Sequence, residues 1–184
     1  MLNYIKQVLE SLLSVNELEL GPWCIEVLSM LEMKGGQVQP STRRCLILNA
    51  WGHTGILPGI LGVVKSSPNL ETLVIKGKCI PPQVSLARYR ATTYLRKHKL
   101  DLILSHLKTI KITGFTISIL SGEPMLTMIQ ILVKSAKVLK KMVITAEESV
   151  GTSSTSTTST DLTIITKTVI TFPRASPEAV IEVG

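Results

Sequence analysis

Short segments with alternating apolar residues recur along the chain and follow one phrase. A leucine is followed three positions later by Leu, Ile or Met, and two positions after that by isoleucine. The full phrase occurs at residues 70–75, 107–112 and 139–144, and a shortened form occurs at residues 46–48. Apolar side chains at alternate positions suit a short strand that buries one of its faces. The pattern therefore predicts a strand that is repeated along the chain.

Helical patterns alternate with these strands. Apolar residues recur at helical spacing in residues 1–15, 24–33 and 84–104, and Pro58 and Pro124 stand at positions typical of a first helical turn. The predicted strands are residues 18–20, 45–48, 70–76, 107–113 (ending at Gly114), 140–146 and 180–183.

The spacing of the strands predicts the fold class. Equivalent apolar positions are Leu18, Leu46, Leu73, Ile110, Met142 and Ile181, which by subtraction lie 28, 27, 37, 32 and 39 residues apart. Leucine-rich repeats span about 20–29 residues, so the first two intervals fit and the later three are longer. A strand–helix unit buries its apolar face only by stacking on its neighbours, and a right-handed connection makes the strands parallel. The prediction is an α/β fold: a leucine-rich-repeat-like solenoid with a curved, mostly parallel sheet and helices on one side.

Residues 149–160 form a low-complexity segment of serine and threonine. Such a segment has few side chains to bury, so it predicts a flexible loop. After it we expect a helix or an extended segment from Asp161 and then the terminal strand.

Composition bounds the function. No apolar run reaches the 18–20 residues or so of a membrane helix, and the N-terminus does not resemble a signal peptide. Three widely spaced cysteines indicate a reducing intracellular compartment, cytoplasmic or nuclear. The net charge of +7 raises a nucleic-acid-binding alternative, but runs of charge are more often solvated surfaces. We therefore expect neither a membrane nor a nucleic acid as partner.

The candidate catalytic and metal-binding residues do not form a recognisable site. The three histidines and the three cysteines lack metal-ligand spacing, and no nucleophile or phosphate-binding motif occurs; they are His53, His98, His106, Cys24, Cys45 and Cys79. His106 is interpreted as a partly exposed residue at a strand edge, and the cysteines as core-facing or edge thiols. We predict no enzyme activity, no catalytic residue, no cofactor and no metal. Trp23 and Trp51 either cap the core at the edge of a repeat or serve as exposed anchors for a partner, and the first reading is favoured.

Several phrases resemble one plant protein family. The segments 18–24, 45–49 and 67–75 resemble the leucine-rich repeats of plant F-box proteins that end in an FBD domain. The segments 107–115, 136–144 and 172–176 resemble the FBD domain itself. The resemblance implies a leucine-rich-repeat region at residues 1–94 and an FBD domain at residues 95–184, with the Ser/Thr-rich loop inside it.

The same resemblance implies a function. Members of this family recruit targets to SCF-type ubiquitin ligases: an F-box binds a Skp-family adaptor, and the repeats hold the target. The F-box motif is not found in this chain, where Leu57-Pro58 is the only echo of it. A Skp-family adaptor is therefore expected as a partner only if an F-box lies upstream.

The resulting hypothesis is a non-catalytic, target-recognition part of a ubiquitin ligase subunit, whose target is unknown. The alternatives are an F-box-less relative that acts as a competitor or is a non-functional copy, and a basic nucleic-acid-binding protein. Outward strand positions are the candidate contacts, namely Glu71, Val74, Lys108 and Lys111.

Overall fold

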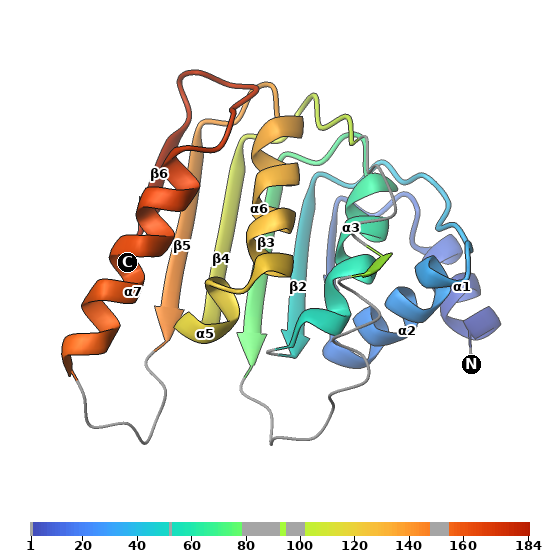
Figure 1. The fold of residues 1–184 in the computed structure, drawn as a ribbon. Helices are drawn as coiled ribbons and strands as arrows, with labels where there is room; N and C mark the ends of the chain where they lie inside the picture. The colour runs from blue at the N-terminus through green and yellow to red at the C-terminus, as the bar shows by residue number, and fades with distance from the viewer. Residues whose placement is uncertain (1, 52, 79–92, 95–101, 148–154) are drawn as a thin grey trace.

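The computed structural model describes residues 2–51, 53–78, 93–94, 102–147 and 155–184 (Figure 1). The strands are β1 (Glu17–Leu20), β2 (Cys45–Trp51), β3 (Thr72–Lys78), β4 (Thr109–Thr116), β5 (Lys141–Glu147) and β6 (Val180–Val183). The helices are α1 (Leu2–Ser11), α2 (Pro22–Met33), the 3-10 turn η1 (Thr54–Ile56), α3 (Leu57–Lys65), α5 (Ile117–Leu120), α6 (Glu123–Ser135) and α7 (Thr155–Ile170).

The described strands form one sheet in the order of the sequence, and every neighbouring pair is parallel. The described helices lie along one face of this sheet (Figure 1). The prediction of an α/β fold with a parallel sheet is therefore confirmed.

The register of the sheet follows the repeated phrase. One row across all six strands joins the equivalent positions found in the sequence: Leu18, Leu46, Leu73, Ile110, Met142 and Ile181. The next inward row is Leu20, Leu48, Ile75, Ile112, Ile144 and Val183. The unequal intervals between units thus lie in the connections, because the strands themselves stay in register.

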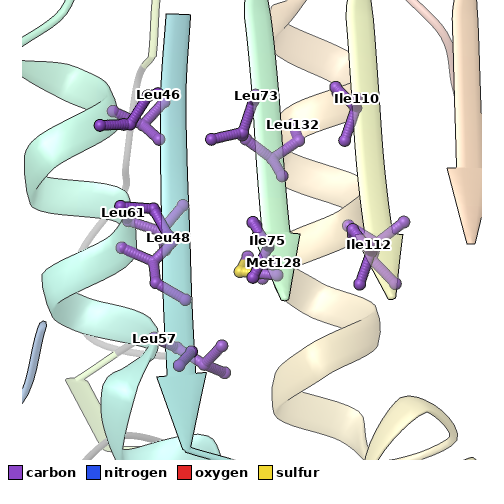
Figure 2. Packing of buried hydrophobic residues seen from close by; sticks show 14 of the residues in the cluster. Leu46, Leu48, Leu57, Leu61, Leu73, Ile75, Ile110, Ile112, Met128 and Leu132 are labelled. Carbon is purple, nitrogen blue, oxygen red and sulfur yellow. The ribbon is translucent and has the colours of Figure 1, made fainter. Parts of the chain in front are cut away.

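These inward rows form the core with the helices. Leu46, Leu48, Leu73 and Ile75 have no exposed surface, and they pack towards Leu57 and Leu61 of α3 and towards Met128 and Leu132 of α6 (Figure 2). Helix α3 is buried from Leu57 to Val64. A helix that is apolar on all sides must be enclosed, and α3 indeed contacts both α2 and α6.

Helices α2 and α3 cross closely at Gly59. A Cβ atom there would lie 2.5 Å from the Ile25 carbonyl oxygen and 2.6 Å from the Ser29 amide nitrogen. The hydroxyl of Ser29 donates to the Ile56 carbonyl at 3.0 Å and accepts from the Gly59 amide at 2.9 Å. The buried serine is therefore satisfied at the place where the two backbones meet.

Strand β4 continues past the predicted end at Gly114, which corrects the sequence prediction. Gly114 has a φ of 76° and the register to β5 shifts between Ile112 and Phe115. A bulge with a glycine at positive φ inserts one residue and lets the strand resume. The shift turns Phe115 into the core, where it is fully buried. On the other side, the backbone of Gly77 in β3 lies against Gly114 with no space for a Cβ.

The predicted flexible loop at residues 149–160 is wrong over its second half, because α7 begins at Thr155. The rest of that tract lies outside the described residues. The cause lies further along the helix, where Ile165 and Val169 are buried. Once packing has nucleated a helix, extending it costs little.

The predicted helix at residues 84–104 falls largely outside the described residues. Within them, Thr93 and Tyr94 are helical, whereas residues 102–104 are not. Leu104 instead forms a parallel bridge with Ala136, so the predicted helix is wrong at its C-terminal end.

Candidate functional site

The face of the sheet opposite the helices is the candidate site, and we call it the open face. Because successive side chains of a strand point to opposite sides, the residues between the buried ones belong to this face. Its central members are partly or fully exposed: Ile47, Asn49, Trp51, Thr72, Val74, Lys76, Lys78, Thr109, Lys111, Thr113 and Val143. Parallel sheets are usually covered on both faces, whereas no described helix covers this one (Figure 1).

An apolar row crosses the open face. Ile47 of β2 pairs in register with Val74 of β3, which pairs with Lys111 of β4 and then with Val143 of β5. The row therefore reads apolar, apolar, basic, apolar across four strands. Lysine can lay its alkyl stem along such neighbours and keep its ammonium group in water.

The lysines at the centre of the face lack acidic partners. Lys76, Lys78 and Lys111 are exposed, and none of them forms an ion pair with another residue in the described part of the chain. Lys76 follows Val74 on the same face of β3, and Val74 is the register partner of Lys111. We call these three residues the lysine cluster.

Carboxylates stand at both edges of the open face. Glu19 on β1 accepts a hydrogen bond of 2.6 Å from the side chain of Asn49. Glu182 on β6 forms an ion pair of 2.9 Å with Lys141. The charge of the face is thus positive over β3 and β4 and negative or balanced over the outer strands.

A polar hollow lies at the amino ends of the first four strands. Its volume is about 450 Å³, and it is lined by Ser14, Asn16, Thr42, Arg44, Asn69, Glu71 and His106. Glu71 pairs with Lys108 at 2.6 Å and with Arg44 at 3.4 Å. The hydrogen bond from Lys108 lowers the pKa of the Glu71 carboxyl, and the nearby charges of Lys108 and Arg44 add to this effect. The charged groups of the hollow therefore largely satisfy one another.

The four candidate contact residues separate into two places. Val74 and Lys111 lie side by side on the open face, whereas Glu71 and Lys108 are paired with each other at the amino ends of the strands. The sequence could not distinguish the two places, because the residues just before a strand have the same polar character as its outward positions.

Those of the other sequence candidates that lie in the described part of the chain do not assemble into a reactive site. His53 contacts Glu26 at 3.2 Å, while His106 is exposed beside the hollow. Cys24 and Cys45 are free and partly exposed. Burial, and then the charge of Glu17, raise the pKa of the Cys45 thiol, which disfavours the nucleophilic thiolate. His98 and Cys79 lie outside the described residues.

The two tryptophans differ. Trp23 in the first turn of α2 is 71% exposed, so the prediction that it caps the core is wrong. Trp51 ends β2 and is the register partner of Lys78, which places it on the open face beside the lysine cluster. Its place on the open face depends on the register, which its sequence position alone did not reveal.

Within the described residues, no group of three or more His, Cys, Asp or Glu side chains is arranged to hold a metal ion. Among the same residues, no helix combines the length and the apolar character that a membrane span requires.

Arg43 is a residue that sequence reasoning missed. It is fully buried, and none of its three guanidinium nitrogens has a hydrogen-bond partner among the residues that the structure describes. Burial lowers the pKa of this guanidinium. A usable signal was present, because Arg43 stands three positions before Leu46, where the repeated phrase elsewhere has leucine.

Comparison of the chain with protein-family models, with curated proteins and with solved structures gives no match. The geometry of the open face therefore has to support the functional conclusion.

Proposed function

We propose that this chain is the protein-binding, target-recognition part of an SCF-type ubiquitin ligase subunit and that the target lies on the open face. The resemblance to plant F-box proteins with repeats and an FBD domain supplies the ligase context. The observation that carries the binding function is the open face itself: a six-stranded sheet that presents an apolar row and unpaired lysines to solvent.

A solenoid interpretation supports this proposal. Each strand pairs only with its neighbours in the sequence, and one register runs through all six units. Repeat arrays of this kind offer an extended face for binding other proteins. The division into a repeat region at residues 1–94 and an FBD domain at residues 95–184 stays a prediction from the resemblance. A non-catalytic role is consistent with this function, because such a subunit contributes proximity rather than chemistry.

The test is site-specific photo-crosslinking in plant cells. A photoreactive residue at Thr72 reports on the open face, and the same residue at the exposed Lys134 of α6 reports on the helical side. We expect one protein to be captured from Thr72 and not from Lys134. Its ubiquitylation should fall when the chain is depleted. Equal capture from both positions would contradict the proposal, and so would unchanged ubiquitylation of the captured protein after depletion of the chain.

The competitor alternative shares the open face but lacks ligase coupling. The mass of the endogenous protein, detected with an antibody to its C-terminal end, separates the two. A species much heavier than 20.1 kDa that co-purifies with a Skp-family adaptor supports the ligase subunit. A species of that mass without the adaptor supports a competitor or a non-functional copy.

A further inference from the structure

The unpaired charge at the centre of the open face indicates what kind of partner it fits. The three lysines of the lysine cluster lie on the adjacent strands β3 and β4. Lys111 is the register partner of Val74, and Lys78 is the register partner of Trp51. Like charges on neighbouring strands repel one another. An occupant that brings carboxylates relieves this repulsion and covers the apolar row at the same time.

The spacing of the open face suits an extended chain. Along β3, the outward residues Thr72, Val74, Lys76 and Lys78 follow one another at every second position. Their spacing is about 6.6 Å, which is also the distance between alternate side chains of an extended peptide. A segment lying along β3 can therefore meet Val74 with an aliphatic side chain and the two lysines with carboxylates.

The edges of the face argue against a nucleic acid as this occupant. A nucleic acid carries phosphates along its whole length, so a strand crossing the sheet would meet Glu19 on one side and Glu182 on the other. A short acidic protein segment places its charges only over β3 and β4. Electrostatic complementarity of this kind gives an interface its register and specificity.

We propose that the partner region held at the centre of the open face is an acidic, extended protein segment in which carboxylates stand beside aliphatic side chains. This inference rests on the proposed function and specifies the chemistry of the target segment.

The test measures binding of labelled peptides to the full chain by fluorescence anisotropy. The probe is a peptide in which one set of alternate residues carries leucine and then two glutamates, with serine between them (Leu-Ser-Glu-Ser-Glu), so that all three side chains lie on one face of the extended chain. Its matched controls carry glutamine or lysine in place of glutamate. A single-stranded RNA oligonucleotide is measured alongside. The protein variants are K76E/K111E and K76Q/K111Q on the open face. The charge-matched control is K134E/K137E, at exposed positions near the end of α6 and in the turn after it.

We expect the glutamate peptide to bind more tightly than the glutamine and lysine peptides, with an affinity that falls as salt is added. K76E/K111E should bind it about tenfold more weakly, and K76Q/K111Q should show a smaller loss. K134E/K137E should stay within about twofold of the parent protein. Retention of the parent melting temperature shows that the face variants are folded.

Three results would overturn the inference: equal binding of the glutamate and glutamine peptides, equal losses in K76E/K111E and K134E/K137E, or RNA binding that exceeds peptide binding and is lost in K76E/K111E. Crosslinking from Thr72 does not depend on acidic chemistry. If the target captured there lacks acidic segments, this inference alone is overturned. If ubiquitylation of the target is unchanged when the chain is depleted, the proposed function alone is overturned.

Discussion

At the level of single residues, Arg43 occupies a place that the register gives to aliphatic side chains. Backbone hydrogen bonds tie Arg44 to Asn16, Glu71 to Arg44 and Lys108 to Glu71, so the residues just before them are also equivalent. Those residues in the other units are Val15, Leu70 and Leu107, and both leucines are buried. Arginine stays protonated in proteins, so this unit buries a charge where its neighbours bury leucine.

Replacement of Arg43 by methionine should stabilise the protein. Even a buried ion pair is often replaced by apolar side chains with a gain of up to about 1–4 kcal/mol, and an unpaired charge loses no Coulomb attraction when it is removed, so we expect a gain in this range. In a chain of this size that gain corresponds to a rise of about 2–4 °C in the melting temperature for each kcal/mol. Thermal unfolding followed by circular dichroism measures it, and Arg44→Met, with a side chain 66% exposed, is the control. A lower melting temperature for Arg43→Met would show that the guanidinium has a stabilising partner.

At the level of elements, the contact between α2 and α3 depends on the missing side chain of Gly59. Alanine inside a helix ordinarily gains about 0.5–1 kcal/mol over glycine. Here the added Cβ would collide with backbone atoms of α2, which no rotamer change can relieve.

Gly59→Ala should therefore destabilise the protein, by about 1–3 kcal/mol, against the usual preference of a helix. Urea unfolding gives the difference in free energy of unfolding. Gly21→Ala is the matched control, because nothing lies within 4 Å of a Cβ there. Gly21 is the N-cap of α2, where alanine is less favourable than glycine, so the free energy of unfolding should fall by only about 0.5 kcal/mol. An unchanged or higher stability of Gly59→Ala would mean that the two helices can separate without loss.

The elements also show what the sequence could and could not predict. The strands were predictable because each buries one face and so alternates between apolar and polar residues. Helix α7 begins inside a Ser/Thr tract because the packing of Ile165 and Val169 stabilises the whole helix. The composition of the tract itself does not indicate this packing, so the start of the helix could not be predicted. The continuation of β4 depended on the positive φ of Gly114. The open face could not be predicted without the register of the strands. Val74 and Lys111 are 37 positions apart in the sequence and are neighbours only because β3 and β4 pair.

At the scale of the whole molecule, each strand of the described sheet has only its sequence neighbours beside it. The outer strands β1 and β6 are short, with 4 residues each, and have one neighbour each. Opening such a strand breaks one ladder, whereas opening a central strand breaks two. Local stability in proteins varies with the number of contacts that an opening disrupts.

Hydrogen exchange followed by mass spectrometry should therefore show a gradient across the sheet. We expect the amides of β1 and β6 to exchange faster than those of β3 and β4, which pair on both sides. The buried helix α3 should be protected together with the central strands. Uniform protection across all six strands would mean that the sheet opens only as one unit.

The glycine pair at the bulge has a consequence for how this protein can change over evolutionary time. Gly77 lies on β3 and Gly114 on β4. The connection between these two strands is the longest among the first four strands, yet the backbones of the two glycines touch. Insertions and substitutions in that connection can accumulate during evolution while the contact between the two glycines keeps the two strands in register. A side chain at either position would instead collide with the backbone of the other glycine, which no substitution there can relieve, so we expect both positions to stay glycine.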